Sequence, residues 1–158
     1  LRVKSEESDN SMGWKCAQYG MKGVPVRVEG GPRELENGQC ILVRRTDGEK
    51  VTVKREDLEA EAARQLEIVQ QQMFDKAKKN LEENIYPAYS LEEAKQLQKE
   101  RGGFIKTMWC GDEACEIKMK EEAGMSSRCM PLTQEHLSDV CPICGKPAKT
   151  MIYWGVAY

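Results

Sequence analysis

The chain has 158 residues, of which 40% are apolar and 32% are charged, and its formal net charge at pH 7 is −2. This length accommodates one ordinary domain or two small ones. No stretch approaches the roughly 20 apolar residues that a membrane-spanning helix needs, so we expect no membrane partner, and the near-neutral charge argues against a strongly basic nucleic-acid-binding protein.

The first elements in chain order are a strand end, a helix and a second strand. Residues 1–4 are typical of the end of a strand, and Ser11 is a candidate cap for the short helix that follows. Residues 24–29 alternate strictly, with three valines on one face and Arg27 and Glu29 on the other. This period of two predicts a β-strand with one polar face.

The next segment has the pattern of a turn followed by a β-hairpin. Residues 31–38 are rich in glycine and polar side chains and are expected to form a turn containing at most one helical turn. Residues 39–46 and 49–56 are apolar and β-branched, and Asp47 and Gly48 lie between them. An Asp-Gly pair between two such runs is a strong hairpin signal.

After residue 56 the hydrophobic period changes from two to 3.6. One apolar stripe is expected to face the core, formed by Leu58, Ala62, Leu66, Val69, Met73 and Ala77. The stripe predicts a long helix over residues 57–86 that Pro87 ends. Ser90 and Glu93 then have the spacing of a capping box for a second helix over residues 90–102.

The last third of the chain alternates strands and a helix. Residues 102–110 and 126–132 are predicted strands, residues 112–124 a helix, and residues 149–158 a final strand or tail. This α+β unit is small, and small units commonly need a metal or disulfides to reinforce their core.

Charge is distributed unevenly along the chain. Residues 22–55 hold eight Lys/Arg against five Asp/Glu, whereas residues 56–100 hold six against eleven. A basic sheet region followed by an acidic helical region is the electrostatic pattern expected of an RNA-binding surface. A solvated mixed-charge surface produces much the same pattern, so both interpretations stay open.

Four of the seven cysteines have the spacing of metal ligands. Cys110 and Cys115 form one pair, and Cys141 and Cys144 form a second pair after 25 intervening residues. Each pair has a glycine in its turn, and Gly145 can adopt the positive φ that directs backbone N–H groups toward the thiolates. Four thiolates make a closed tetrahedral zinc site, so the sequence predicts one structural zinc.

Disulfides and thiol redox chemistry are the alternatives to a metal. An odd number of cysteines and the lack of a secretory apolar segment favour a reducing compartment. A redox C-x-x-C motif normally opens a helix, whereas Pro147 closely follows the second pair. Cys40 and Cys129 lie in apolar runs and are expected to be buried, Cys16 has no assigned role, and His136 is expected to be an exposed loop residue.

Catalytic motifs are largely absent from the sequence. It contains no glycine-rich phosphate-binding loop, and a zinc closed by four cysteines has no open position for an activated water. The chain starts at Leu1 rather than methionine. We therefore expect a binding and architectural piece of a longer protein.

Two stretches resemble a known family. GWK…MKGVPVRVEGGPRELENGQCILVRR resembles the second half of the anticodon-binding domain of prolyl-tRNA synthetase. WCGDEACE…SSRCMPL…CPICGKPAKTMIYWGVAY resembles the zinc-binding domain at the C-terminus of the archaeal/eukaryotic type of this enzyme, which some bacteria also carry. The resemblance covers nearly all of residues 10–55 and 103–158, and more weakly the helices between them.

The resemblance implies a fold and a domain division. The fold is an α/β anticodon-binding domain, a mixed sheet with flanking helices whose N-terminal part is missing, followed by a small α+β zinc-binding domain. Residues 1–86 are expected to hold the C-terminal part of the anticodon-binding domain with its connecting helix. Residues 87–158 are expected to form the zinc-binding domain.

The resemblance also implies a function. The full-length protein is expected to be a cytoplasmic homodimer, a class II aminoacyl-tRNA synthetase that ligates proline to tRNA(Pro) with ATP and Mg²⁺. ATP and Mg²⁺ belong to a catalytic domain that this piece lacks, so the piece alone is expected to be inactive. Tyr158, at the end of the tail, is expected to pack toward that catalytic domain.

Four residues are expected to contact tRNA(Pro). Anticodons for proline end in two guanines, because proline codons begin with two cytosines. A carboxylate matches the adjacent donors of an unpaired guanine and a guanidinium matches its acceptors, which assigns Glu29 and Arg33 to base reading. Arg44 and Lys54 are expected to hold neighbouring phosphates. A surface ion pair between Glu29 and Arg33 is the simpler alternative.

Two other functions remain open at this point. A zinc-ribbon module that binds nucleic acid or protein without enzymatic activity predicts a basic zinc unit, but residues 103–158 hold six Lys/Arg against seven Asp/Glu. A thiol redox protein predicts reactive cysteines, and metal-bound, unreactive cysteines would exclude it.

Overall fold

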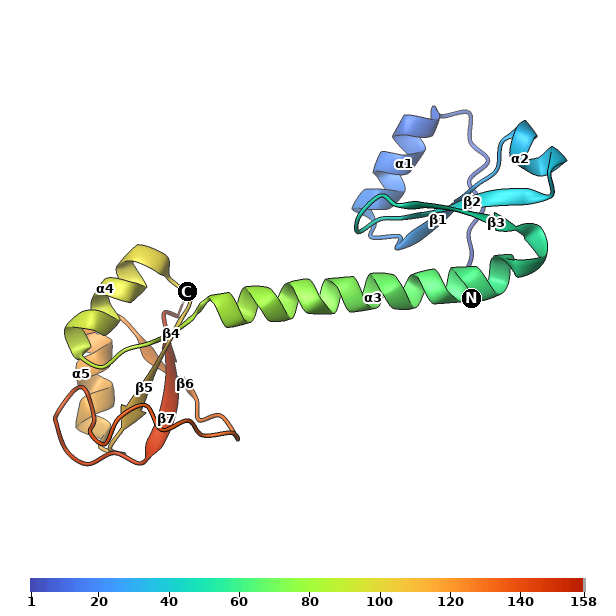
Figure 1. The fold of residues 1–158 in the computed structure, drawn as a ribbon. Coiled ribbons are helices and arrows are strands. Elements are labelled where there is room, and N and C mark those ends of the chain that lie inside the picture. The colour runs from blue at the N-terminus through green and yellow to red at the C-terminus, as the bar shows by residue number, and fades with distance from the viewer. Residues whose placement is uncertain (158) are drawn as a thin grey trace. The chain divides into compact units, whose positions relative to one another are not determined.

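A computed structural model of the chain describes residues 1–157. The chain forms two compact units, Leu1–Ala77 and Lys78–Tyr158 (Figure 1). Each unit has a sheet of its own. None of the helices in residues 1–157 combines the length and the apolar composition that a membrane crossing requires.

The first unit contains a three-stranded antiparallel sheet with the strand order β1-β2-β3. Its elements are α1 (Met12–Met21), β1 (Val26–Glu29), α2 (Pro32–Glu36), β2 (Gln39–Arg44), β3 (Lys50–Lys54), the 3-10 turn η1 (Arg55–Asp57) and the start of α3 (Leu58–Glu83). The expected mixed sheet is thus purely antiparallel in the described part of this unit. The hairpin turn lies at Asp47 and Gly48, as predicted, and Gly48 has a φ of +73°.

Local sequence explains where the elements of the first unit begin. Ser11 caps α1, because its Oγ accepts a hydrogen bond from the Trp14 N–H at 3.3 Å. Pro32 opens α2, where a missing N–H costs nothing. Residues 1–4 form no strand. That prediction is wrong, because β-propensity gives a strand only where a neighbouring strand pairs with it.

The core of the first unit is small and lies between the sheet and the start of α3. Cys40, Leu42 and Val53 are buried, and Leu58 and Ala62 pack against them from α3. The predicted apolar stripe of α3 therefore contributes to the core at its N-terminal end. Further along the helix Met73 is 48% exposed, so the stripe does not face the core over its whole length.

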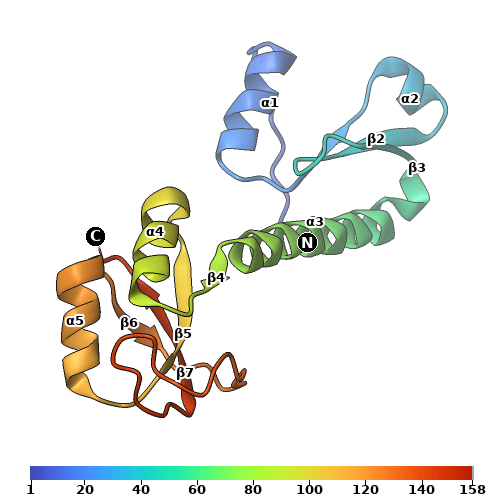
Figure 2. The ribbon, with the colours of Figure 1, turned by 60° about the vertical axis from the view of Figure 1, so that its left-hand side comes forward.

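The second unit is built on a mixed sheet with the strand order β4-β5-β7-β6. Its elements are β4 (Ile85–Pro87), α4 (Leu91–Arg101), β5 (Phe104–Trp109), α5 (Glu113–Ala123), β6 (Ser126–Cys129) and β7 (Thr150–Gly155). Strands β4 and β5 are parallel and joined by α4, and the other pairs are antiparallel. Figure 2 shows α4 and α5 side by side along the sheet.

Side-chain caps and one glycine fix the elements of the second unit. Ser90 caps α4 by accepting a hydrogen bond from the Glu93 N–H at 3.1 Å. Gly103 precedes β5 with a φ of +76°, and a Cβ there would lie 2.4 Å from the Asn84 carbonyl oxygen. The core is rich in methionine and centres on Trp154, whose indole N–H donates to Thr107 Oγ1 at 2.9 Å.

Candidate metal centre and nucleic-acid interface

The four predicted ligand cysteines come together in the second unit. Cys110 follows β5, Cys115 lies in the first turn of α5, and Cys141 and Cys144 lie in the loop between β6 and β7. Their sulfurs all lie within 4.8 Å of one another. Two segments that are far apart in the sequence thus form one thiol cluster.

The spacing of the sulfurs suits a metal and not a disulfide. Cys110 Sγ is 3.6 Å from both Cys115 Sγ and Cys144 Sγ. Four thiolates about 2.3 Å from a tetrahedral ion are about 3.8 Å apart, whereas two bonded sulfurs are about 2.05 Å apart. All seven cysteines are free thiols. The cluster can therefore hold a metal ion.

Two similar turns, each made of a cysteine, a glycine and a polar residue, build half of this cluster. Gly111 and Gly145 have φ values of +86° and +74°, a region that favours glycine. In each turn the N–H two residues after the cysteine donates to its sulfur: Asp112 to Cys110, and Lys146 to Cys144. These N–H groups favour the thiolate form that metals bind.

Burial and hydrogen bonding move the thiol pKa values in opposite directions. Burial raises the pKa of Cys110 and of Cys115, because both sulfurs are removed from water. The Lys146 N–H lowers the pKa of the more exposed Cys144 to about 7. Cys141 is fully buried. Backbone N–H groups stabilise single thiolates, but four thiolates packed this closely repel one another unless a cation lies between them, so the donor set fits a soft divalent metal.

The remaining cysteines and the single histidine lie outside the cluster. Cys40 is buried, as expected. Cys129 is exposed, so its predicted burial is wrong: it ends β6, an edge strand with an irregular register at this point. Cys16 is partly buried in α1. His136 is exposed and pairs with Asp139 at 3.0 Å, which confirms its expected place in a loop.

Glu29 lies at the end of β1, on the face expected from its alternation. Its carboxylate is 2.5 Å from Arg27 Nε and 3.9 Å from Lys50 Nζ, and its side chain is 18% exposed. In the strand register Arg27 lies opposite Val43, and Val43 lies opposite Lys50 on the next strand. Sequence reasoning did not predict either cation as a partner of Glu29. The signals were present, because Arg27 lies on the same face of β1 as Glu29 and the register of the hairpin places Lys50 in line with Arg27 across the sheet.

Arg33 is on the exposed surface of α2, a few residues after Glu29. Within residues 1–157 its side chain has no ion-pair partner, and its carbonyl accepts the side-chain N–H of Asn37 at 2.9 Å. The surface pair of Glu29 and Arg33 that was the simpler alternative is therefore not formed in the described residues, where Glu29 pairs with Arg27 and Lys50 instead.

Arg44 is placed in the interior of the first unit. Its side chain is 6% exposed and donates to Asp47 at 2.9 Å, to Gln65 Oε1 at 2.7 Å and to Glu49. Asp47, and to a smaller extent Glu49, hold the pKa of the Arg44 guanidinium above its usual value. The same guanidinium holds the pKa of Asp47 well below its usual range. Arg44 thus faces α3, away from Glu29.

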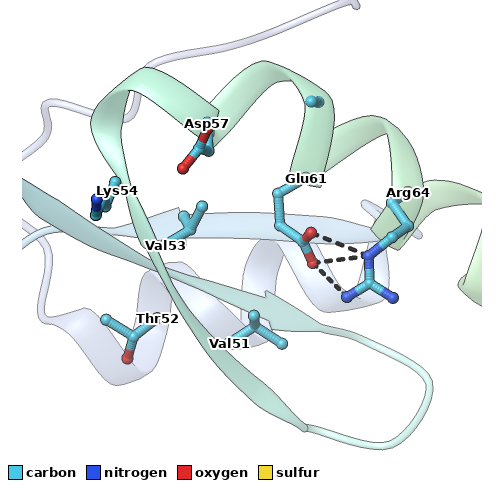
Figure 3. A pocket seen from close by; sticks show the side chains of 8 residues that line it. Val51, Thr52, Val53, Lys54, Asp57, Glu61 and Arg64 are labelled. Carbon is cyan, nitrogen blue, oxygen red and sulfur yellow. Dashed lines mark hydrogen bonds and ion pairs between the residues drawn. The ribbon is translucent and has the colours of Figure 1, made fainter.

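Lys54 ends β3 and lies beside two shallow hollows. Its side chain is 67% exposed and lies 3.6 Å from Glu56. One hollow of about 560 Å³ lies between β3 and the start of α3, with the ion pair of Glu61 and Arg64 at its far side (Figure 3). The second also borders the end of α2, near Asn37.

Comparison with known proteins gives two family matches that together cover most of the chain. Residues 1–65 match the family described as anticodon binding domain. Residues 91–158 match the family described as prolyl-tRNA synthetase, C-terminal. The order of the two matches along the chain is the order of the two units in the structure.

Curated relatives agree with both matches. The proline--tRNA ligase of Lachnospira eligens is 49% identical over 158 residues, which is 100% of this chain and 33% of the relative. Proline--tRNA ligase 2 of Bacillus thuringiensis subsp. konkukian and the proline--tRNA ligase of Clostridium novyi are each 50% identical over 157 residues, 99% of this chain and 33% of the relative. The chain spans about a third of the length of these relatives.

The two matches indicate an anticodon-binding region followed by the C-terminal region of an aminoacyl-tRNA synthetase. More particularly, the chain corresponds to the anticodon-binding and C-terminal region of prolyl-tRNA synthetase.

Proposed function

We propose that the chain is the tRNA-reading and metal-stabilised part of an enzyme that ligates proline to tRNA(Pro) with ATP and Mg²⁺. The observation that supports this proposal is the presence, in one polypeptide, of an anticodon-binding match and a prolyl-tRNA synthetase C-terminal match. The nucleotide and proline sites would lie in the part of the relatives that this chain does not span. The chain alone should not catalyse proline-dependent pyrophosphate exchange, and robust exchange by the pure chain would contradict this proposal.

The tRNA surface that we propose comprises Glu29 and Arg33 for the guanine bases and Lys54 for a phosphate. Arg27 and Lys50 hold the Glu29 carboxylate in place and add positive charge beside it. Arg33 offers a guanidinium that no described acid neutralises. For Arg44 we propose a structural role in place of the expected phosphate contact, because its donors are engaged with Asp47, Glu49 and Gln65.

Base reading by Glu29 is tested with Glu29→Gln, which removes the charge and one of the two acceptors at nearly constant volume. Affinity is measured at fixed salt for a tRNA(Pro) transcript and for the same transcript with both anticodon guanines replaced. The substitution should weaken binding of the cognate transcript by about 1–3 kcal/mol and change binding of the altered transcript little.

The matched control is Glu36→Gln, which removes an exposed acid at the end of α2. A general electrostatic effect would change the affinity of both transcripts in both variants, since phosphate contacts carry no sequence information. Equal losses for the two transcripts in Glu29→Gln would show that Glu29 does not read a base. Arg33→Met should behave as Glu29→Gln does, because it removes the proposed guanine-acceptor contact.

We further propose that the metal is one structural zinc. The support is the all-thiolate donor set and the sulfur separations of 3.6 Å, close to those of a tetrahedral zinc site. Elemental analysis of the purified chain should give about one zinc per chain. Bound zinc would stabilise the second unit, because a metal that binds only the folded state adds its binding free energy to folding.

Cys141→Ser tests the structural role of zinc. Cys141 is fully buried in the cluster, and its loss should release zinc and destabilise the second unit. Cys129→Ser is the control, because Cys129 is exposed in the same unit and outside the cluster. Wild-type stability of Cys141→Ser, or a metal-free wild-type protein, would contradict the zinc proposal.

Several finer assignments also belong to this proposal. The functional boundary is placed after residue 86, so that residues 87–158 form the zinc-binding domain. That the full-length enzyme is of the archaeal/eukaryotic type rests only on the resemblance of the two sequence stretches, and the bacterial relatives do not support it. Homodimerisation and a cytoplasmic location are expected of the full-length enzyme. Tyr158, whose tail was expected to pack on the catalytic domain, lies outside the described residues.

A further inference from the structure

An ion pair links the two halves of the cysteine cluster. Lys146 Nζ is 2.8 Å from Asp112 Oδ2, and these residues occupy equivalent positions in the two turns. Each is the second residue after a cluster cysteine and follows a glycine of positive φ. The two turns are 34 positions apart in the sequence, so this pair is a direct side-chain connection between segments that meet only in the folded unit.

Each partner of this pair is also bonded to both cysteines of its own half. The Asp112 N–H donates to Cys110 Sγ, and the Asp112 carbonyl accepts from the Cys115 N–H at 3.1 Å. Asp112 Oδ1 caps α5, the helix that carries Cys115, by accepting from the Ala114 N–H at 3.1 Å. Asp112 therefore fixes the first pair of cysteines through three separate bonds.

Lys146 has the same relation to the second pair of cysteines. Its N–H donates to Cys144 Sγ, and its carbonyl accepts from the Cys141 N–H at 2.8 Å. Through the ion pair, the backbone frames of all four cysteines form one connected network. The ion pair itself involves none of the four sulfurs, so each of them can still bind a metal.

We propose that the Asp112–Lys146 ion pair is a positioning element for the metal, which holds the two turns at the separation that four thiolates require and slows metal release. This inference rests on the metal site proposed above. Polar groups next to metal ligands orient them, and their loss commonly weakens metal binding by about 10- to 100-fold. Both side chains are partly exposed, 63% for Lys146 and 39% for Asp112, so the effect should lie at or below the lower end of that range.

Asp112→Asn separates the ion pair from the helix cap. Asparagine caps a helix as well as aspartate does and keeps the oxygen that accepts from Ala114, but it cannot form an ion pair with Lys146. Lys146→Met removes the charge and keeps the apolar stem, while its backbone bonds to Cys141 and Cys144 persist. Lys95→Met is the matched control, because Lys95 forms an exposed ion pair of 2.6 Å with Glu122 in the same unit.

The measurement is the rate of zinc release from the whole chain to an excess of a chromophoric chelator. Asp112→Asn and Lys146→Met should each release zinc about three to ten times faster than wild type. The double variant should release it no faster than either single variant, because both remove the same interaction. Lys95→Met should release zinc at the wild-type rate.

Two further readouts distinguish positioning from loss of a ligand. Cobalt-substituted variants should keep the wild-type sulfur-to-cobalt absorption bands, because all four thiolates remain. Salt at about 1 M, where the Debye length is about 3 Å, should raise the wild-type release rate toward that of the variants and affect the variants less.

Three results would overturn the inference. Wild-type release rates in both charge variants would show that the pair does not act on the metal, and the zinc site would still stand. An equal acceleration in Lys95→Met would show a general charge effect. A wild-type chain that holds no zinc would overturn the metal site and this inference together.

Discussion

Arg44→Met should destabilise the first unit strongly, because Arg44 connects the β-hairpin to α3. The Arg44 guanidinium donates to Gln65 Oε1 at 2.7 Å, and Gln65 is fully buried. Methionine keeps the apolar stem but leaves that oxygen without its donor in the interior. An unpaired buried acceptor costs about 1–3 kcal/mol, and removing one partner of a buried charged pair costs about 3–5 kcal/mol. Since the Asp47 side chain is 34% exposed and regains water, we expect about 2–3 kcal/mol.

The assay must report on the first unit alone, since the two units need not unfold together. Native-state hydrogen exchange at the amides of β2 does so, because slowly exchanging core amides follow the unfolding free energy of their own cooperative unit. Arg45→Met is the control. Arg45 is the exposed neighbour of Arg44, and its substitution should change the free energy of unfolding by no more than about 0.5 kcal/mol.

Equal protection of the β2 amides in wild type and Arg44→Met would refute this reasoning, because it would show that the buried network does not stabilise the unit. The tRNA affinity of Arg44→Met gives a second check. If Arg44 contacted a phosphate, the substitution would reduce the slope of log affinity against log salt concentration by about one, because one fewer counterion would be released on binding. We expect that reduction for Lys54→Met.

Two further predictions concern pH and one glycine. Hydrogen bonds from Arg64 and then Gln65 lower the pKa of Glu61 from 4.5 to about 2. The stability that Glu61 contributes is therefore complete above pH 4.5 and is lost as the pH falls to about 2. Protection of the β2 amides from hydrogen exchange should fall in that pH window, and it should fall less in Arg64→Met. Gly103→Ala should lower the unfolding free energy of the second unit, measured in urea, by at least about 2 kcal/mol, because the strain of a positive φ adds to a clash between the new Cβ and the Asn84 backbone. Gly124→Ala is the control and should cost about 1 kcal/mol, because Gly124 also has a positive φ but no atom of the described residues lies within 4 Å of its Cβ position. Equal losses in the two variants would contradict the clash.

Short-range sequence patterns made the hairpin and the clustering of the four cysteines predictable. An Asp-Gly pair between two β-branched runs specifies its own turn, and the structure places the turn there. The four cysteines follow from spacing, since a closed thiolate site needs two pairs with room for a connecting fold between them. In both cases the signal itself is local, at the turn of the hairpin and within each cysteine pair, although 25 residues separate the two pairs.

The burial of Arg44 was not predictable in the same way. Alternation placed Arg44 on the face opposite Ile41 and Val43, which agrees with the register of β2. Alternation does not say which face a later helix covers, and α3 covers the face of Leu42 and Arg44. A buried arginine then needs partners, and Gln65 supplies one from 21 residues away in the sequence.

Strand β4 was missed because it is too short to have a period. It spans Ile85 to Pro87, whereas the sequence pattern assigns Ile85 and Tyr86 to the end of a helix and Pro87 to its stop. Pro87 signalled a boundary, and proline is tolerated in an edge strand because one side of such a strand needs no N–H donor. Pairing with β5, which lies beyond α4, decides the conformation of this segment, and no local pattern predicts it.

The position of β7 in the second sheet has a consequence for how the protein folds while it is being translated. Strand β7 lies between β5 and β6, although both neighbours precede it in the chain. When β6 leaves the ribosome, the place between it and β5 is still empty, and Cys141 and Cys144 are not yet available. The sheet and the cluster are therefore completed almost together, after everything upstream has been translated. Translation proceeds at about 5–20 residues per second, so the apolar faces of β5 and α5 stay uncovered for seconds, and chaperone binding is expected to concentrate in that interval.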